Sequence, residues 1–179
     1  AIVGCTRENF PLIEASTKAV LAALEKHVVN RHSLFGTRPS LAEFSIFGQL
    51  SQLGTDPTPQ AMMRAEFPYS YRWLAHVDDM SGVEGEWEDS IAPVVAELAR
   101  ISGEVYAPFL LANAAAAQSG AETFSMTAMG LPYEQGTFKY QVKCLADLRA
   151  RYAALDGDAK AVVDPVLGPS WREALSPAG

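Results

Sequence analysis

One apolar stripe constrains the fold of this chain more than any other feature of its sequence. Seven apolar side chains recur at spacings of three and four residues: Ile91, Val94, Leu98, Ile101, Val105, Phe109 and Ala112. Side chains at these spacings share one face of an α-helix. The sequence therefore predicts one long helix to about residue 117. Pro108 lies inside the pattern and removes one backbone donor, so a kink or a break is expected there.

Helical periodicity covers most of the remaining chain. A helix is expected from Pro11 to about residue 30, and Pro59 and Pro68 each suit the first turn of a shorter helix. A last long helix follows Thr137, whose hydroxyl is suited to cap it, and a short helix lies near 158–163, before a proline-rich tail. The expected apolar faces of the three longer segments comprise Ile13, Val20, Leu24 and Val28; Tyr69, Trp73, Val77 and Met80; and Phe138, Val142, Leu145, Leu148, Tyr152 and Leu155.

A capping box marks the start of the second helix. Ser40 and Glu43 stand three residues apart, so that the serine side chain and the glutamate side chain can each accept from the other residue's backbone N–H. Leu41, Phe44, Phe47 and Leu50 follow at three-residue spacing, and we expect them to form an apolar stripe into the core.

Only one segment departs from helical periodicity toward extended structure. Residues 122–128 alternate polar and apolar side chains with a period of two. The expected fold class is therefore all-α, with at most a short extended segment near 122–128. A length of 179 residues suits one domain, so we expect a single domain over residues 1–179.

Charge and cysteine content narrow the function classes. The net charge of -7 argues against nucleic acid as a partner, because binding a phosphate backbone needs clustered cations. No run of about 18 apolar residues is present, so no membrane partner is expected. Two cysteines far apart in the chain, Cys5 and Cys144, favour a reducing, cytoplasmic location over a disulfide-stapled one. Cys5 is expected to be a disordered terminal cysteine and Cys144 a buried, inert one.

A longer run of residues then suggests a family. The segment LFGTRPSLAEFSIFGQLSQLGTDPTP, followed by FPYSYRWLAHVDDMSG, resembles the C-terminal helical domain of bacterial glutathione S-transferase-like proteins. Ser40 matches that family's capping position, Trp73 and Met80 match its later pattern, and Glu43 stands where the family usually has Asp. The match covers residues 11–82 well, and residues 83–179 resemble the helical extension of a longer subgroup.

The resemblance implies a glutathione S-transferase C-terminal-like helical bundle and a place in a two-domain enzyme. The helical domain would supply the hydrophobic second-substrate side of a glutathione-conjugating transferase, and a thioredoxin-like domain, absent here, would activate the thiol. Glutathione would be the co-substrate of the full-length protein, and a homodimer is a further expectation. No catalytic residue or cofactor is expected in this chain, which alone should show no turnover. The alternative is a non-catalytic protein-interaction or scaffold module.

Candidate binding residues cluster near the extended segment. Tyr133, Lys139 and Tyr140 would line the second-substrate pocket that the resemblance implies, and ordinary packing is the alternative for all three. No metal site is expected. His27, His32 and His76 lack metal-ligand spacing, and the acids between Asp78 and Asp89 do not follow the spacing of a calcium-binding loop, so a solvated acidic connector is the better interpretation.

Overall fold

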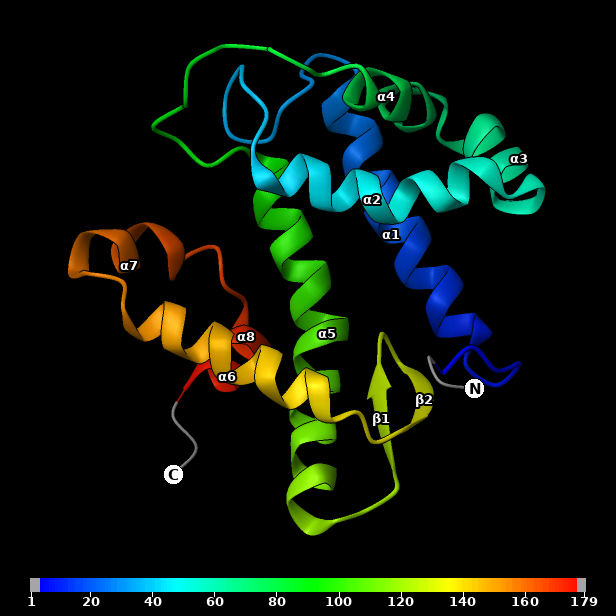
Figure 1. The fold of residues 1–179 in the computed structure, drawn as a ribbon, viewed down its shortest axis with the longest axis vertical. Coiled ribbons are helices and arrows are strands. Elements are labelled where there is room, and N and C mark those ends of the chain that lie inside the picture. Colours follow the sequence, from blue (N-terminus) through cyan, green and yellow to red (C-terminus); the bar gives the residue numbers. More distant parts are fainter. Residues whose placement is uncertain (1–3, 177–179) are drawn as a thin grey trace. The chain divides into compact units, whose positions relative to one another are not determined.

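The computed structural model describes residues 4–176 and is drawn in Figure 1. Within these residues the chain forms eight helices and one antiparallel hairpin, which confirms a mostly helical protein. The elements in chain order are α1 (Phe10–Val28), α2 (Leu41–Thr55), α3 (Pro57–Glu66), α4 (Pro68–Asp78), α5 (Pro93–Ser119), β1 (Thr123–Ala128), β2 (Leu131–Gly136), α6 (Lys139–Ala153), α7 (Gly157–Val163) and α8 (Pro169–Leu175). None of the helices in this range is both long and apolar enough to cross a membrane.

Two compact units make up the chain. The central unit contains Ala19–Leu98, and the terminal unit contains the chain up to Lys18 together with everything from Ala99 onward. Helices α1 and α5 each contribute residues to both units. We describe the two units separately below.

The expected capping box opens α2 in the central unit. The hydroxyl of Ser40 accepts from Ala42 N at 3.1 Å and donates to the Glu43 carboxylate, which also accepts from Ser40 N at 2.7 Å and from Leu34 N. The Glu43 side chain is fully buried, and every neighbour that bonds to it is a donor. A single carboxylate thus ties the start of α2 to the loop that precedes it.

A second carboxylate closes the start of α4. Phe67 precedes Pro68 and offers no side-chain cap, but Glu25 of α1 accepts from Tyr69 N at 3.0 Å, from Ser70 N at 2.7 Å and from the Ser70 hydroxyl at 2.7 Å. Pro68 is the first residue of α4 and Pro59 is the third residue of α3, so both prolines lie in the first turn of a short helix, as predicted. The acceptor that caps α4 therefore lies on another helix.

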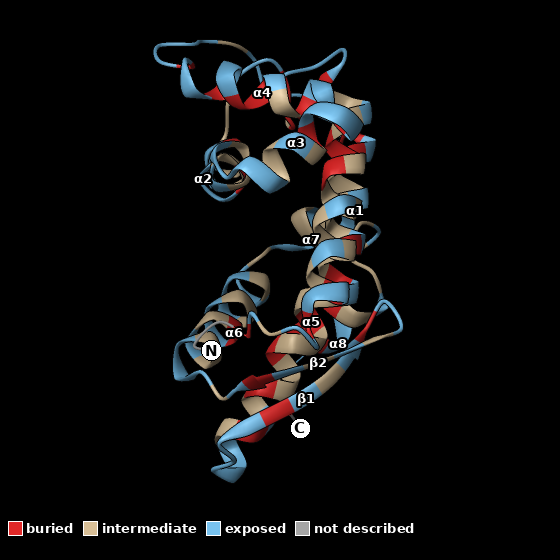
Figure 2. Cartoon of the chain, turned by 90° about the vertical axis from the view of Figure 1, so that its right-hand side faces the viewer, coloured by how far each residue is buried: buried red, intermediate tan, exposed pale blue. Residues whose placement is uncertain are grey.

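The predicted core face of α4 is mostly correct. Trp73, Val77 and Met80 are buried, and the Trp73 indole N–H donates to His32 O at 2.8 Å. Tyr69 is exposed, contrary to the expected stripe, because it lies in the first turn beside the capping carboxylate of Glu25. Figure 2 shows the buried residues gathered along one face of this helix.

Helix α2 departs from its predicted packing. Leu50 is buried, but Leu41 is 82% exposed and Phe44 is 45% exposed. The reason is geometric: residues three apart turn about 300° around a helix, so a stripe at three-residue spacing drifts by about 60° per step and reaches the opposite side after three steps. The second apolar side of α2 therefore faces away from the core of the central unit, and Figure 2 shows how little of this helix is buried.

In the terminal unit, α5 runs without interruption through Pro108, so the expected break does not occur. The buried core beside it joins α5 to α6 and α8 and consists of Ala107, Leu110, Leu145, Trp171, Ala174 and Leu175. Helix α8 begins at Pro169, within the proline-rich tail, for which no helix was predicted. Its Trp171 donates its indole N–H to the Ser102 hydroxyl of α5 at 2.9 Å.

The extended segment predicted near 122–128 is confirmed as β1, and β2 is a second strand beyond the single short segment expected. The two strands pair in antiparallel register, so that Met126 faces Tyr133 and Ser125 faces Glu134. Met129 and Gly130 connect the strands, and both have positive φ, 49° and 73°. Positive φ at both central residues is the requirement of a tight two-residue hairpin turn. Figure 1 shows the hairpin beside the second half of α5, and the ring of Phe124 meets the ring of Phe109 at 5.2 Å.

Two buried asparagines hold the ends of this hairpin. Asn9 donates to Glu134 O at 2.7 Å and accepts from Glu134 N at 3.1 Å. Asn113 of α5 likewise donates to Phe138 O at 3.0 Å and accepts from Phe138 N at 2.7 Å. The predicted cap at Thr137 is wrong: α6 begins at Lys139, its N-cap is Phe138 without a side-chain bond, and the Thr137 hydroxyl donates to Ala121 O instead.

Candidate functional site

An aromatic cavity of about 270 Å³ lies inside the terminal unit. Four segments build it: the first two turns of α1, the middle of α5, the inner face of the hairpin and the start of α6. Its lining residues are Leu12, Ile13, Ser16, Val105, Tyr106, Phe109, Met126, Tyr133, Gln135 and Gln141. None of these side chains is charged. We call this space the aromatic cavity.

Three rings form its wall. Tyr106 and Phe109 lie stacked, with centroids 5.9 Å apart and planes 18° apart, and Tyr133 meets Phe109 edge-on at 6.2 Å. Tyr106 and Phe109 are three residues apart on α5 and so share one helical face. Tyr133 reaches the same wall because alternate residues of β2 face α5.

Both tyrosines are joined to a glutamine. The Tyr106 hydroxyl donates to Gln141 Oε1 at 2.8 Å, and the Tyr133 hydroxyl donates to Gln135 Oε1 at 2.7 Å. Burial raises the pKa of Tyr106, with smaller contributions from Cys144 and Tyr140, and burial likewise raises the pKa of Tyr133, with a contribution from Cys5. Both phenols therefore keep their protons at neutral pH and act as donors to the glutamine oxygens.

The three predicted binding residues lie in two places. Tyr133 lines the aromatic cavity and is half-buried. Lys139 and Tyr140 stand at the start of α6, are exposed, and are not among the residues that line this cavity. The Tyr140 ring lies 6.3 Å from that of Phe138, also exposed. The structure thus brings Tyr133 together with α5 and leaves the other two at the surface.

Sequence reasoning did not assign the other lining residues to a cavity, including Tyr106, Phe109, Gln135 and Gln141. Phe109 belongs to the apolar stripe of α5, where the wall of a cavity has the same sequence pattern as the core, and Tyr106 lies outside that stripe. Gln135 carried a usable signal: it shares the inward face of β2 with Leu131 and Tyr133, where a polar residue is unusual. Gln141 carries no such signal in the sequence, because its side chain reaches the cavity only as a result of where α6 begins in the folded chain.

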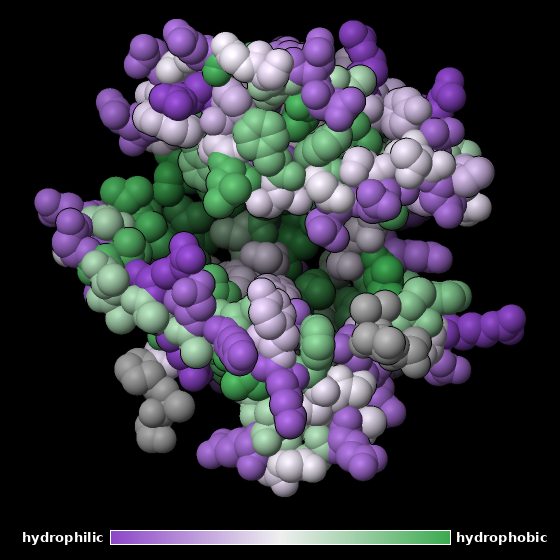
Figure 3. Space-filling view, viewed as in Figure 1, coloured by the Kyte–Doolittle hydropathy of each residue, from purple (hydrophilic) through white to green (hydrophobic). Residues whose placement is uncertain are grey.

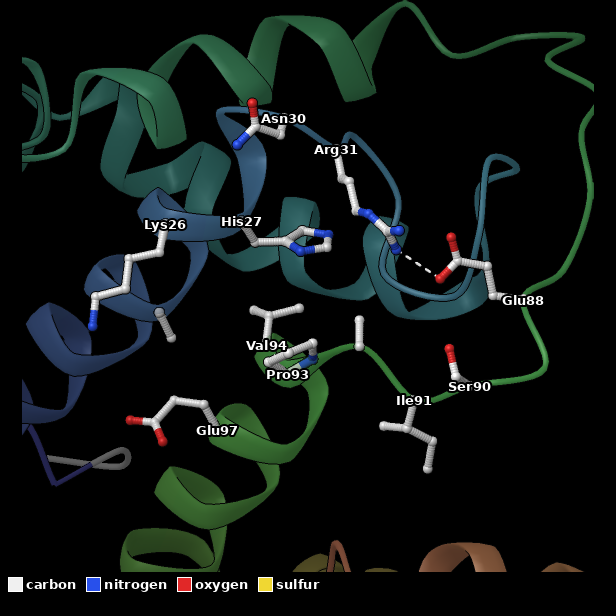
Figure 4. A pocket seen from close by; sticks show the side chains of 12 residues that line it. Lys26, His27, Asn30, Arg31, Glu88, Ser90, Ile91, Pro93, Val94 and Glu97 are labelled. Atoms are coloured by element: carbon white, nitrogen blue, oxygen red, sulfur yellow. Dashed lines mark hydrogen bonds and ion pairs between the residues drawn. The ribbon is translucent and has the colours of Figure 1, made fainter.

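A larger cavity, of about 670 Å³, lies in the central unit. Figure 4 shows side chains from the end of α1, including Lys26 and His27, across from Pro93, Val94 and Glu97 of α5. Arg31 and Glu88 close one side with an ion pair of 2.6 Å between Arg31 Nη1 and Glu88 Oε2. The His27 Nε2–H donates to Ser33 O at 2.9 Å.

The larger cavity is lined by exposed charges. Its charged residues are Lys26 and Arg31, which are basic, and Glu88 and Glu97, which are acidic, and all four are exposed. Exposed charges of both signs interact weakly and are screened by salt. The aromatic cavity, with uncharged walls, two tyrosine–glutamine pairs and a buried amide at Gln135, is the better candidate for selective binding.

The remaining sequence candidates lie at the surface or in packing positions. Across residues 4–176 no group of three or more His, Cys, Asp or Glu side chains is arranged to hold a metal ion. His32 and His76 meet with ring centroids 4.0 Å apart, and the pKa of His76 is lowered by partial burial and by His32, against a raising influence of Asp79. Cys5 is exposed and Cys144 is half-buried, both as free thiols.

Comparison with protein-family models, with curated proteins and with solved structures finds no match to this chain. The resemblance to glutathione S-transferase-like proteins therefore stays a prediction that depends on residues 11–82.

Proposed function

We propose that this chain is the helical half of a glutathione S-transferase-like protein, supplying a docking face for a thioredoxin-like domain and an apolar cavity for the second substrate. Glutathione would be the co-substrate of the full-length protein. The observation that carries the proposal is the apolar side of α2 that the central unit leaves uncovered.

The uncovered face consists of Leu41 and Phe44, one turn apart at the start of α2. Leu41 is 82% exposed although the same turn contains the fully buried Glu43. Figure 3 shows apolar side chains at the surface over this helix. A helix that is apolar on both sides normally lies between two layers, and contiguous apolar surface of this kind marks an interaction site. The capping box directly before this face is the motif on which the resemblance depends.

The aromatic cavity supports the second half of the proposal. It offers uncharged, ring-lined space of the kind that takes a small apolar molecule. Both tyrosine hydroxyls of this lining already donate to glutamine oxygens, so activation of the glutathione thiol is assigned to the partner domain.

The decisive measurement is the intact mass of the native protein, captured from its source cells with an antibody against this chain. A mass roughly 9–12 kDa above 19.3 kDa corresponds to one additional small domain and supports the proposal. The full protein would then be assayed for conjugation of glutathione to an aromatic electrophile. A native mass equal to that of this chain rejects the transferase function and favours the stand-alone interaction module.

A paired variant tests the docking face in the full-length protein. Leu41→Glu combined with Phe44→Glu should separate the thioredoxin-like domain, lower conjugation activity and expose the linker to protease. Val162→Glu is the matched control, because Val162 is also an exposed apolar residue but lies on α7. Equal activity in both variants would remove α2 as the docking face.

A further inference from the structure

The aromatic cavity contains a buried amide whose donors are not fully used. Gln135 is only 7% exposed, and its Oε1 accepts from the Tyr133 hydroxyl. Its Nε2 has two N–H groups, but the one acceptor recorded for it in the described residues is Gly136 O at 3.5 Å, the outer limit of a hydrogen bond. A buried donor without a good partner costs about 1–3 kcal/mol, which an incoming acceptor can recover.

Gln141 repeats this arrangement on the other side. Its Oε1 accepts from the Tyr106 hydroxyl at 2.8 Å, so the oxygen of each glutamine is already occupied by a phenol. Each tyrosine hydroxyl has one proton and donates it in that hydrogen bond, so it cannot also donate to a ligand. The Ser16 hydroxyl likewise donates to Ile13 O at 3.0 Å. What the polar part of the lining can still donate to a ligand is therefore amide N–H, from Gln135 and from Gln141.

The shape and charge of the cavity limit the ligand further. The cavity is partly open to solvent, and its volume of about 270 Å³ exceeds the roughly 150 Å³ that accepts benzene, so it suits one substituted ring. The rings of Tyr106, Phe109 and Tyr133 favour a flat partner that meets them by stacking or edge-on. An ionised ligand would lose its hydration without meeting an opposite charge, since all ten lining side chains are uncharged.

We infer that the aromatic cavity binds a neutral, planar, single-ring ligand that has a carbonyl-type acceptor oxygen, and that Gln135 and Gln141 select it by donating amide N–H bonds to that oxygen. This inference deepens the proposed function by naming the class of second substrate. The binding of the ligand does not depend on the proposed function; only the later reaction of the bound ligand with glutathione does.

A matched pair of probes tests the role of the oxygen. 4-Methylacetophenone has an acceptor oxygen, and 4-isopropenyltoluene has the same shape with a methylene group in its place. Binding of each to this chain is measured by titration of ¹H–¹⁵N spectra, including the side-chain amide signals of both glutamines. We expect the ketone to bind about tenfold more tightly, which is the effect of one modest hydrogen bond. The amide protons of Gln135 or Gln141 should shift only with the ketone.

Variants locate the selecting groups. Each glutamine variant is made together with the Phe variant of its tyrosine, because a freed phenol could itself donate to the ketone. Relative to Tyr106→Phe alone, adding Gln141→Met should reduce the preference for the ketone, and adding Gln135→Met to Tyr133→Phe should do the same. Gln118→Met, at an exposed position of α5, is the control. If Gln135→Met does not fold, the half-buried Gln141 still decides the outcome.

Equal affinity for the two probes, no binding of either probe, or an unchanged preference in both glutamine variants would overturn the inference. These results are independent of the native mass and of the α2 variants. The ligand class and the proposed transferase function can therefore fail separately.

Discussion

The central unit fastens its buried backbone with carboxylates, whereas the terminal unit does so with asparagine amides. Glu43 accepts from two backbone N–H groups and a hydroxyl, and Glu25 does the same at α4. Asn9 and Asn113 each donate to the C=O and accept from the N–H of one residue, Glu134 and Phe138 respectively, and Asn9 donates to Gly4 O as well. Each carboxylate is therefore surrounded only by hydrogen-bond donors. Each asparagine amide faces both a donor, the backbone N–H, and an acceptor, the backbone C=O.

This difference between the two units reflects the backbone groups that each kind of side chain has to satisfy. The start of a helix presents only N–H groups, so an acceptor-only, negatively charged side chain satisfies it best. An extended residue at the edge of a hairpin presents N–H and C=O together, which a carboxylate cannot match and an amide can. Exchanging the two side-chain types should therefore lower the stability of only the unit in which the exchange is made.

The largest effect is expected at Glu43. Glu43→Ala leaves Leu34 N, Ser40 N and the Ser40 hydroxyl without their acceptor in a buried site, which should lower the free energy of unfolding of the central unit by roughly 3 kcal/mol or more. Hydrogen–deuterium exchange would show lost protection in α2 and not in α6. The isosteric Glu43→Gln should also destabilise, because its amide places a donor among donors.

Asp156→Ala is the control for this prediction. Asp156 caps the exposed start of α7 through one bond to Ala159 N, and its loss should cost about 1 kcal/mol within the terminal unit. Wild-type protection of α2 in both Glu43 variants would show that the carboxylate is not what fastens this unit.

A smaller effect is expected at Asn113. Asn113→Ala leaves Phe138 N without its acceptor and removes one of the two donors to Phe138 O, the other being Gln141 N. It should destabilise the terminal unit by about 2 kcal/mol, measured by urea unfolding. Asn113→Asp preserves the bond from Phe138 N but loses the bond to Phe138 O, so it should not restore stability. Asn30→Ala, at an exposed asparagine, is the control and should change little. Full stability of Asn113→Asp would contradict the distinction between the two side-chain types.

Glu25 should have a more local effect. Glu25→Gln weakens the acceptor for Tyr69 N and Ser70 N and removes the charge at the start of α4, at a cost of about 1–2 kcal/mol. Amide exchange should rise first in α4. Glu14→Gln, exposed on the same helix, is the comparison variant. Uniform loss of protection throughout the central unit would show instead that Glu25 supports the whole unit.

The smallest expected effect is on how the stability of each unit depends on pH, with the central unit weakened at low pH and the terminal unit at high pH. The lowered pKa of His76 means that the unfolded chain takes up its proton first, so this histidine weakens the central unit as pH falls below about 6.5. The raised pKa values of Tyr106 and Tyr133 mean that the unfolded phenols ionise first, so the terminal unit weakens as pH rises above about 10.

Thermal melts at a series of pH values test this assignment. His76→Asn should flatten the stability profile between about pH 7.5 and pH 5.5, and Tyr133→Phe should flatten it above about pH 10. A profile that neither variant changes would show that other groups set the pH response.

The sequence predicts the parts of this fold that depend on neighbouring residues. The capping box of Ser40 and Glu43, the helical start at Pro68 and the helix containing the α5 stripe all follow from spacings of a few residues. The parts it misses depend on distant partners. Thr137 looked like a cap because it precedes a helical pattern, but Asn113, 25 residues away, holds Phe138 and α6 begins later. The hairpin turn at Met129–Gly130 lacks the usual Asn-Gly signal.

The candidate site follows the same rule. Tyr133 was within reach of sequence reasoning, because it stands beside the extended segment. Its role in a cavity depends on Phe109 and on Gln135, whose positions are set by the packing of the hairpin on α5. Leu41 was misplaced for a different reason, since a three-residue repeat rotates around a helix and does not define one face.

The cap of α4 has a consequence for the order in which the chain folds. Its acceptor, Glu25, precedes Tyr69 by 44 residues, whereas α2 contains its own capping residues. Helix α4 can form stably only after α1 is in place, and closing that loop costs entropy before the cap contributes anything. Synthesis from the N-terminus supplies the partners in the right order, since α1 leaves the ribosome first. A circular permutant that begins in the loop after α1, so that residues 4–30 follow residue 176 through a linker, leaves α5 intact. It would reverse this order and should slow the appearance of α4.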